Sequence, residues 1–229
     1  MMAVCACVAA TAAAPQSSTS MVERFLARDD KGPSEYRALR RLEAGNKHFT
    51  TSAWMDVWTD VDASGGLRYE VAAEGGSGYI RKKVFLAALD GEQKMLRDGD
   101  PQRAHLDLTN YVIQDGAVAD GVASLTIKPR RKDVLLIEGQ IFVNPQDGDL
   151  LRIEGRLSKT PSFWTRKVDI VRRYGRIAGV HVPLEIESVA QIFIAGQSTF
   201  RMTYEYETIN GERVGNPQVR VPDRVHSSK

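Results

Sequence analysis

Cysteine is nearly absent from this sequence of 229 residues. The two that occur, Cys5 and Cys7, lie within the first 14 residues, so the rest of the chain contains none. That remainder can form neither a disulfide nor a cysteine-based metal site. A chain of this length can bury enough apolar surface to fold without such cross-links.

Catalytic motifs are also missing. The sequence has no G-x-S-x-G, phosphate-binding loop, dinucleotide fingerprint or H-E-x-x-H, and its four histidines, at positions 48, 105, 181 and 226, are scattered. His181, close to Pro183, is interpreted as a surface residue. We therefore predict a protein that is not an enzyme and has no catalytic residue, no metal site and no cofactor.

Two groups of acidic residues offer the alternatives to that prediction. Glu185 and Glu187 share one face of a predicted strand and could form a carboxylate pair, although that face is polar and favours a solvated role. Asp56, Asp60 and Asp62 could bind calcium, but they lack a ligand loop.

The chain has little net charge. Its 31 basic and 29 acidic side chains give +2, and the basic clusters at 81–83, 130–132 and 172–173 are dispersed. This balance predicts no nucleic-acid partner and no anionic membrane as the main partner. The clusters are interpreted as solvated faces.

The N-terminal segment contains the only alanine-rich apolar stretch. At about 14 residues it is too short to span a bilayer, but it fits the later part of a secretory signal peptide, with an A-x-A site ending at Ala12. Residues 1–12 are therefore predicted to be a signal peptide. Its basic leading region is missing, which leaves two alternatives: a start codon placed too late, or a segment that is not a signal. A signal peptide predicts a periplasmic protein. The alternative is a membrane-anchored lipoprotein acylated on Cys7.

Over residues 134–208, apolar and polar residues alternate with a period of two. In the last run, Phe200, Met202 and Tyr204 alternate with Arg201 and Thr203. Such runs, separated by short turn signals, predict a long series of antiparallel strands. One face of that sheet must be hidden by a packed core or by a ligand.

The remaining elements are predicted from their local patterns. Residues 21–28 form a short helix after Ser20, and three strands follow at 36–43, 54–61 and 67–73. Residues 79–97 form a long amphipathic helix with Gly91 inside it. The predicted fold class is mainly β (α+β), with about ten or eleven strands over 21–209 and a polar, disordered tail over 210–229.

This arrangement resembles a known family. The helix entered through EGGSGYIRKKVFLAAL and the meander through DGDLLRIEGRLSKTPSFWTRKVDIV and VPLEIESVAQIFIAGQSTFRMTYEY are similar to the LolA/LolB-type lipoprotein-carrier superfamily, in its outer-membrane lipoprotein-sorting-like branch. The resemblance covers residues 22–208. It implies an incomplete antiparallel β-barrel with a helical lid around a hydrophobic cavity that carries acyl chains. It also implies that a basic residue near the first strands holds the lid, for which Arg37, Arg40 and Arg41 are the candidates.

The expected function is a periplasmic carrier that binds lipid or lipoprotein acyl chains for transfer towards the outer membrane. The alternative is an envelope sensor or protein-interaction module on the same fold. Expected partners are a lipid or acylated protein and membrane donor and acceptor proteins, and the chain is expected to be a monomer. The residues expected to line the cavity are Phe142, Leu151, Ile153, Trp164, Val168, Ile170, Val182, Leu184, Ile186, Phe200, Met202 and Tyr204. Those of the lid helix are Ile80, Val84, Phe85, Ala88, Leu89 and Met95.

Overall fold

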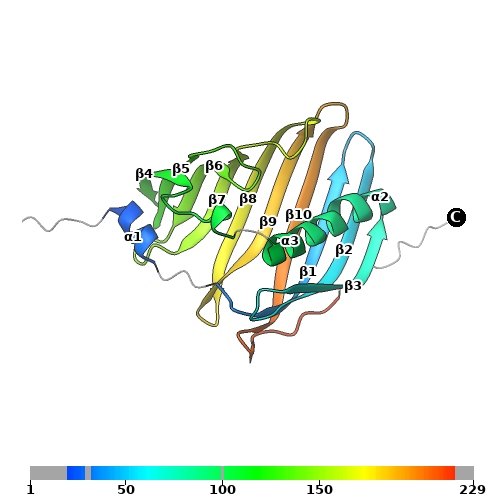
Figure 1. Cartoon of the computed structure of the whole chain (residues 1–229), viewed down its shortest axis with the longest axis horizontal. Helices are drawn as coiled ribbons and strands as arrows, with labels where there is room; N and C mark the ends of the chain where they lie inside the picture. Colours follow the sequence, from blue (N-terminus) through cyan, green and yellow to red (C-terminus); the bar gives the residue numbers. More distant parts are fainter. Residues whose placement is uncertain (1–19, 29–31, 99–100, 220–229) are drawn as a thin grey trace, which may run out of the picture.

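The computed structural model describes residues 20–28, 32–98 and 101–219, and the predicted signal peptide lies outside them. The described chain forms one antiparallel sheet of eleven strands (Figure 1). The strands are β1 (Tyr36–Asn46), β2 (Thr51–Val61), β3 (Leu67–Gly76), β4 (Tyr111–Ala119), β5 (Val122–Pro129), β6 (Ile137–Val143), β7 (Leu150–Leu157), β8 (Thr165–Ile177), β9 (Val180–Ile192), β10 (Gly196–Ile209) and β11 (Glu212–Arg213).

The strand order is β3-β2-β1-β10-β9-β8-β7-β6-β5-β4, with β11 beside β10. The first hairpins thus join the sheet through pairing of β1 with β10, in which Leu42 lies opposite Met202. Strands β3 and β4 remain the two edges, so the sheet curves without closing. The prediction of a mainly β, incomplete antiparallel barrel with a long helix is confirmed.

The long helix crosses the sheet over β1, β2 and β10 (Figure 1). It consists of α2 (Gly78–Ile80), a π-helical turn η1 (Arg81–Leu86) and α3 (Ala87–Asp98), and residues 78–98 are called the covering helix below. Gly76 precedes the helix and has a φ of +79°, a conformation that favours glycine. A side chain would not fit at this position, because a Cβ atom would lie 2.3 Å from the Ser52 carbonyl oxygen. The Ser77 hydroxyl then accepts a hydrogen bond from the Ile80 amide.

Helix α1 (Met21–Ala27) lies at the other end of the sheet, beside β4 and β5 (Figure 1). It begins with a capping box, in which the Ser20 hydroxyl and the Glu23 carboxylate each accept a hydrogen bond from the other residue's amide. Its Phe25 is fully buried. A short 3-10 helix, η2 (Pro101–Ala104), precedes β4. Among the described residues, no helix is both long and apolar enough to cross a membrane.

The face of the sheet that carries the helices, called the inner face, is divided into packed clusters. One cluster joins Phe25 of α1 to strands β4–β8, and a second joins Phe85 and Leu89 of the covering helix to β1, β2 and β10. A third, smaller cluster contains Ala38, Val182 and Tyr206. Because the first two clusters lie on different strands, the region between them is where the inner face can remain unfilled.

The opposite face, called the outer face, is covered by ion pairs between neighbouring strands. Arg201 contacts Glu185 and Glu187 at 2.5 and 3.8 Å, and Arg173 contacts the same two carboxylates at 2.7 and 2.8 Å. These cross-strand pairs make the outer face of β8, β9 and β10 polar, so this part of the face can lie in water.

Several sequence-based expectations are corrected here. His181 is buried, not on the surface: its Nε2 lies 2.7 Å from the Leu150 carbonyl oxygen and its ring stacks on Tyr174. Residues 212–214, which were expected to be disordered, are ordered, because β11 pairs with β10 and Val214 packs against the third cluster. The burial of His181 depends on Leu150, 31 residues away in the chain. Strand β11 instead forms a local hairpin with β10 through Asn210 and Gly211, a turn signal that the prediction of a disordered tail overlooked.

Candidate functional site: an apolar cavity beneath the covering helix

A cavity of about 900 Å³ lies between the covering helix and the inner face of the sheet. From the helix it is lined by Ile80, Val84 and Ala88, and from the sheet chiefly by Val168, Ala190, Ile192 and Phe200. Of the residues that line it, Lys83 alone carries a charge. The cavity is therefore suited to an apolar ligand, and its volume is near the upper end of the range for small-molecule sites, about 300 to 1,000 Å³.

Small side chains on the central strands create the space. Ala44, Ser188, Ala190 and Ser198 occupy inward positions on β1, β9 and β10, where neighbouring inward positions carry Leu42, Ile186 and Met202. Val168 on β8 pairs with Ala190, lines the cavity and also belongs to the first cluster, so it bounds the cavity on that side. The floor is thus recessed between two fully packed regions.

The cavity reaches the solvent at one end of the sheet. There it is lined by Phe49, Pro161 and Ala195, from the turns after β1, β7 and β9, and by Tyr79 at the start of the covering helix. Phe49 and Tyr79 are 56% and 74% exposed, so this end is the mouth of the cavity.

An ion pair between a buried arginine and a partly exposed glutamate ties the covering helix to the sheet. The side chain of Arg40, on β1, is fully buried and donates to both carboxylate oxygens of Glu92 at 2.6 and 3.0 Å, and also to the Tyr36 hydroxyl. Its guanidinium carbon lies 4.8 Å from the centroid of the Tyr204 ring. Burial alone would lower the pKa of Arg40, but its neighbours Tyr204 and Glu92 outweigh burial and raise it, so the guanidinium stays charged.

Two further hydrogen bonds hold the same part of the helix. The Tyr69 hydroxyl donates to Asp90 at 2.5 Å, and the Gln93 side chain donates to the Leu67 carbonyl at 2.8 Å. Of the three arginines considered from the sequence, Arg40 alone reaches the helix. Arg37 and Arg41 point to the outer face and pair with Asp60 and Asp56.

The structure separates the twelve residues expected to line one cavity. Val168 and Phe200 line it, while Ile186, Met202 and Tyr204 pack in or against the second cluster. Ile153 and Ile170 belong to the first cluster, and Val182 to the third. Of the expected lid residues, Ile80, Val84 and Ala88 line the cavity. Ile80, Phe85 and Leu89 are buried, and Met95 is half-buried.

Four of the expected residues lie elsewhere. Phe142, Leu151 and Leu184 line a separate hollow of about 580 Å³ on the outer face. Leu184 and Leu151 are there because β-bulges skip them: Arg173 pairs with Glu185 but Tyr174 with Pro183, and a similar shift occurs between β6 and β7. Trp164 is 55% exposed and lies in the turn before β8.

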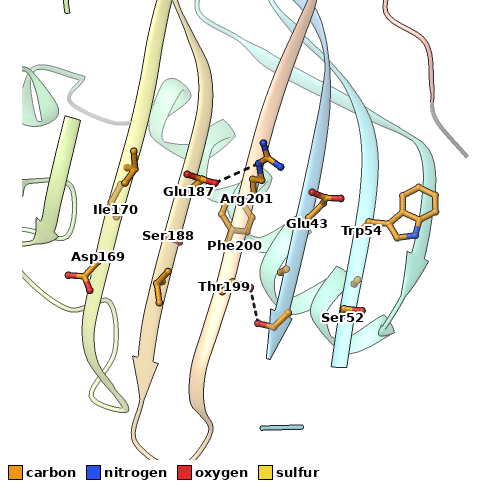
Figure 2. A pocket seen from close by; sticks show the side chains of 15 residues that line it. Glu43, Ser52, Trp54, Asp169, Ile170, Glu187, Ser188, Thr199, Phe200 and Arg201 are labelled. Atoms are coloured by element: carbon orange, nitrogen blue, oxygen red, sulfur yellow. Dashed lines mark hydrogen bonds and ion pairs between the residues drawn. The ribbon is translucent and has the colours of Figure 1, made fainter. Parts of the chain in front are cut away.

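The outer face also has a groove of about 650 Å³, shown in Figure 2. Trp54, Glu43, Arg201 and Glu187 form a row across β2, β1, β10 and β9, following the strand register. Its charged groups already pair with one another or with close neighbours. Arg201 contacts Glu187 at 3.8 Å, and Asp169 contacts Lys167 at 2.7 Å. The groove therefore offers less for a ligand than the apolar cavity.

The acidic residues considered as alternatives are likewise occupied. Glu185 and Glu187 pair with Arg173 and Arg201, while Asp56 pairs with Arg41 and Asp60 with Arg37. Within residues 20–28, 32–98 and 101–219, no group of three histidine, cysteine or acidic residues is placed to hold a metal ion.

Comparison with known proteins adds little to this description. No protein-family model matches the chain, and no curated protein matches it. Among solved structures, the chain is similar to a DUF1329 family protein from Desulfovibrio piger, with 10% sequence identity, a TM-score of 0.39, and coverage of 81% of this chain and 88% of that one.

Proposed function

We propose that this protein is a periplasmic carrier of the LolA/LolB type, which binds an acyl chain of a lipid or lipoprotein in the apolar cavity beneath the covering helix. The observation that carries the proposal is the cavity itself, which is large and lined almost entirely by uncharged side chains. An acyl chain placed there gains about 0.8 kcal/mol for each methylene removed from water. No chemical step is needed for this role, in keeping with a chain that lacks catalytic motifs.

The covering helix serves as the lid in this proposal. Its apolar residues close one side of the cavity, and its carboxyl-terminal half is tied to the sheet by Arg40 and Glu92. The π-helical turn at Arg81–Leu86 lies between the start of the helix and the tied half, and such turns commonly occur at functional sites. Opening would require the Arg40–Glu92 contact to break. The ligand would pass to and from membrane partners, with the protein itself a monomer.

The proposal is tested by binding of a fluorescent long-chain acyl probe to delipidated protein. Ala190→Trp places a large side chain in the cavity, whereas Val189→Trp places the same side chain on the outer face. We expect the first substitution to abolish probe binding and the second to leave it unchanged. Ala190→Leu, with less added volume, should weaken binding to an intermediate degree, and melting curves confirm that each variant is folded.

Equal probe binding by the Ala190→Trp and Val189→Trp variants would refute this location of the site. Failure of the parent protein to bind any acyl probe would favour the alternative, an envelope sensor or interaction module without transport activity.

A further inference from the structure

The two ends of the sheet differ sharply in polarity, which the net charge of +2 conceals. Because adjacent strands run in opposite directions, the turns after β1, β7 and β9 lie at the same end (Figure 1). These turns, at residues 47–50, 158–164 and 193–195, contain no carboxylate, carry Lys47 and Lys159, and are followed at the start of β8 by Arg166. The three turns together with Arg166 are called the rim.

The opposite end has the reverse composition. Its turns, at 62–66, 120–121, 144–149, 178–179 and 210–211, contain four aspartates, no lysine or arginine, and no aromatic or large aliphatic residue. The turns at the mouth of the cavity are therefore basic, and the turns at the opposite end are acidic.

The rim also exposes large apolar side chains. Phe49, Phe163, Trp164, Phe193 and Ile194 are each more than half exposed, and Phe163 is 88% exposed. Tyr79, at the nearby start of the covering helix, is 74% exposed, and the exposed Lys82 and Lys83 follow it. A cluster of exposed aromatic residues costs solubility, and it usually marks a surface that is covered in function.

Hydrogen bonds and ring contacts join the turns of the rim to each other and to the sheet. The Phe193 amide donates to the Trp164 carbonyl at 2.9 Å, and the Asn46 side chain donates to the Ala195 carbonyl at 2.8 Å. The guanidinium carbon of Arg166 lies 4.6 Å from the centroid of the Phe193 ring, and the rings of Phe163 and Trp164 are 4.7 Å apart.

We infer that the rim docks on the surface of an anionic phospholipid bilayer. Trp and other aromatic residues enter the interface between headgroups and acyl chains, while lysine and arginine are attracted to the anionic headgroups. Because the basic and aromatic residues lie around the mouth, attraction of the rim orients the molecule with the cavity mouth against the membrane. Docking would bring the proposed acyl-chain cavity to the membrane, so its role rests on the proposed function. Its evidence is the rim, and vesicle binding can be tested separately from acyl-chain binding.

Cosedimentation with phosphatidylcholine vesicles, with and without phosphatidylglycerol, tests the inference. The parent protein should bind the anionic vesicles, and added salt should weaken binding because it screens the charges. Neutralising the rim in Lys47→Gln/Lys159→Gln/Arg166→Gln should weaken binding roughly a hundredfold, or about fivefold for each charge. Asp62→Asn/Asp120→Asn/Asp147→Asn, at the opposite end, is the matched control and should bind as the parent does.

Tryptophan fluorescence locates the contact. Trp164 is on the rim, whereas Trp54 lies on the outer face, so Trp164→Phe should abolish the blue shift caused by vesicles and Trp54→Phe should retain it. The neutralised rim variant should still bind a soluble acyl probe, which separates docking from ligand binding.

The inference is overturned if the parent protein does not bind anionic vesicles, or if the neutralised rim and the control variant bind them equally. Self-association of the parent through the rim, without vesicle binding, would assign the surface to a second copy of the chain instead.

Discussion

Glu92→Gln should release the covering helix from the sheet, because it removes the charge that compensates Arg40. Arg40 is fully buried, and its Nε atom already has no hydrogen-bond partner. Loss of one member of a buried ion pair costs about 3 to 5 kcal/mol. The Glu92 side chain is 35% exposed, so water weakens the interaction, and we expect a loss of about 1 to 3 kcal/mol in the free energy of unfolding.

Two comparisons separate this pair from an ordinary surface contact. Glu187→Gln removes a partner of Arg173 on the outer face, where both side chains are at least 40% exposed, and it should cost less than about 1 kcal/mol. Arg40→Met combined with Glu92→Met removes both charges, so it should recover most of the stability lost in Glu92→Gln.

Denaturant titration measures these free energies, and hydrogen exchange of the amides in 87–98 measures release of the helix. We expect faster exchange in that segment for Glu92→Gln, because a contact of the closed state is lost, and unchanged exchange in β5 and β6. If Glu92→Gln matches the parent protein in both stability and exchange, the pair does not hold the helix.

Three further outcomes are expected. Met202→Ala should lower the free energy of unfolding by about 2 to 5 kcal/mol in chemical denaturation, because Met202 is packed beneath the helix. Thr203→Ala, on the outer face, should lower it by less than about 1 kcal/mol. Equal losses would contradict the assignment of the two residues to opposite faces. Gly91→Ala should stabilise the protein by about 0.5 to 1 kcal/mol, seen as a higher melting temperature, since the added Cβ meets no atom within 4 Å. Burial of Asp133 alone would raise its pKa, but hydrogen bonds from the Leu135 amide and Arg103 outweigh burial and lower the pKa. The ionised carboxyl group therefore stabilises the fold at pH values above the pKa that Asp133 has in the unfolded chain. Asp133→Asn should accordingly be less stable than the parent near pH 7, with a difference that narrows as the pH falls below about 4; a difference independent of pH would refute this role.

The alternation of residues predicts the faces correctly wherever the strand pairing is regular. Phe200 and Met202 point inward and Arg201 outward, as their period of two requires. Leu151 and Leu184 follow the same sequence pattern but lie at bulges, and a bulge depends on the partner strand, which the local sequence does not specify.

The cavity was harder to predict than the sheet around it. Sequence reasoning selected large apolar residues as its lining, although the space exists because Ala44, Ser188 and Ala190 are small. A usable signal was present in β1, where Arg40 occupies the inward series of Ala38, Leu42 and Ala44. A charge among inward apolar positions indicates a buried partner, here Glu92.

The polarity of the two ends shows another limit of sequence composition. Summed over the chain, the charges nearly cancel, which argued against an anionic membrane as a partner. The sheet topology places Lys47 and Lys159 at one end and Asp62 and Asp120 at the other. Only the order and direction of the strands reveal that separation.

The central claim, that the cavity beneath the covering helix holds an acyl chain, is tested most directly by methyl NMR with a spin-labelled long-chain fatty acid. The label should broaden the methyl signals of Val84, Val168 and Ile192, which line the cavity, more strongly than those of Leu125, which lies on β5 three strands away from β8. Broadening confined to Leu151 and Leu184 in the outer hollow, or none at all, would contradict the claim.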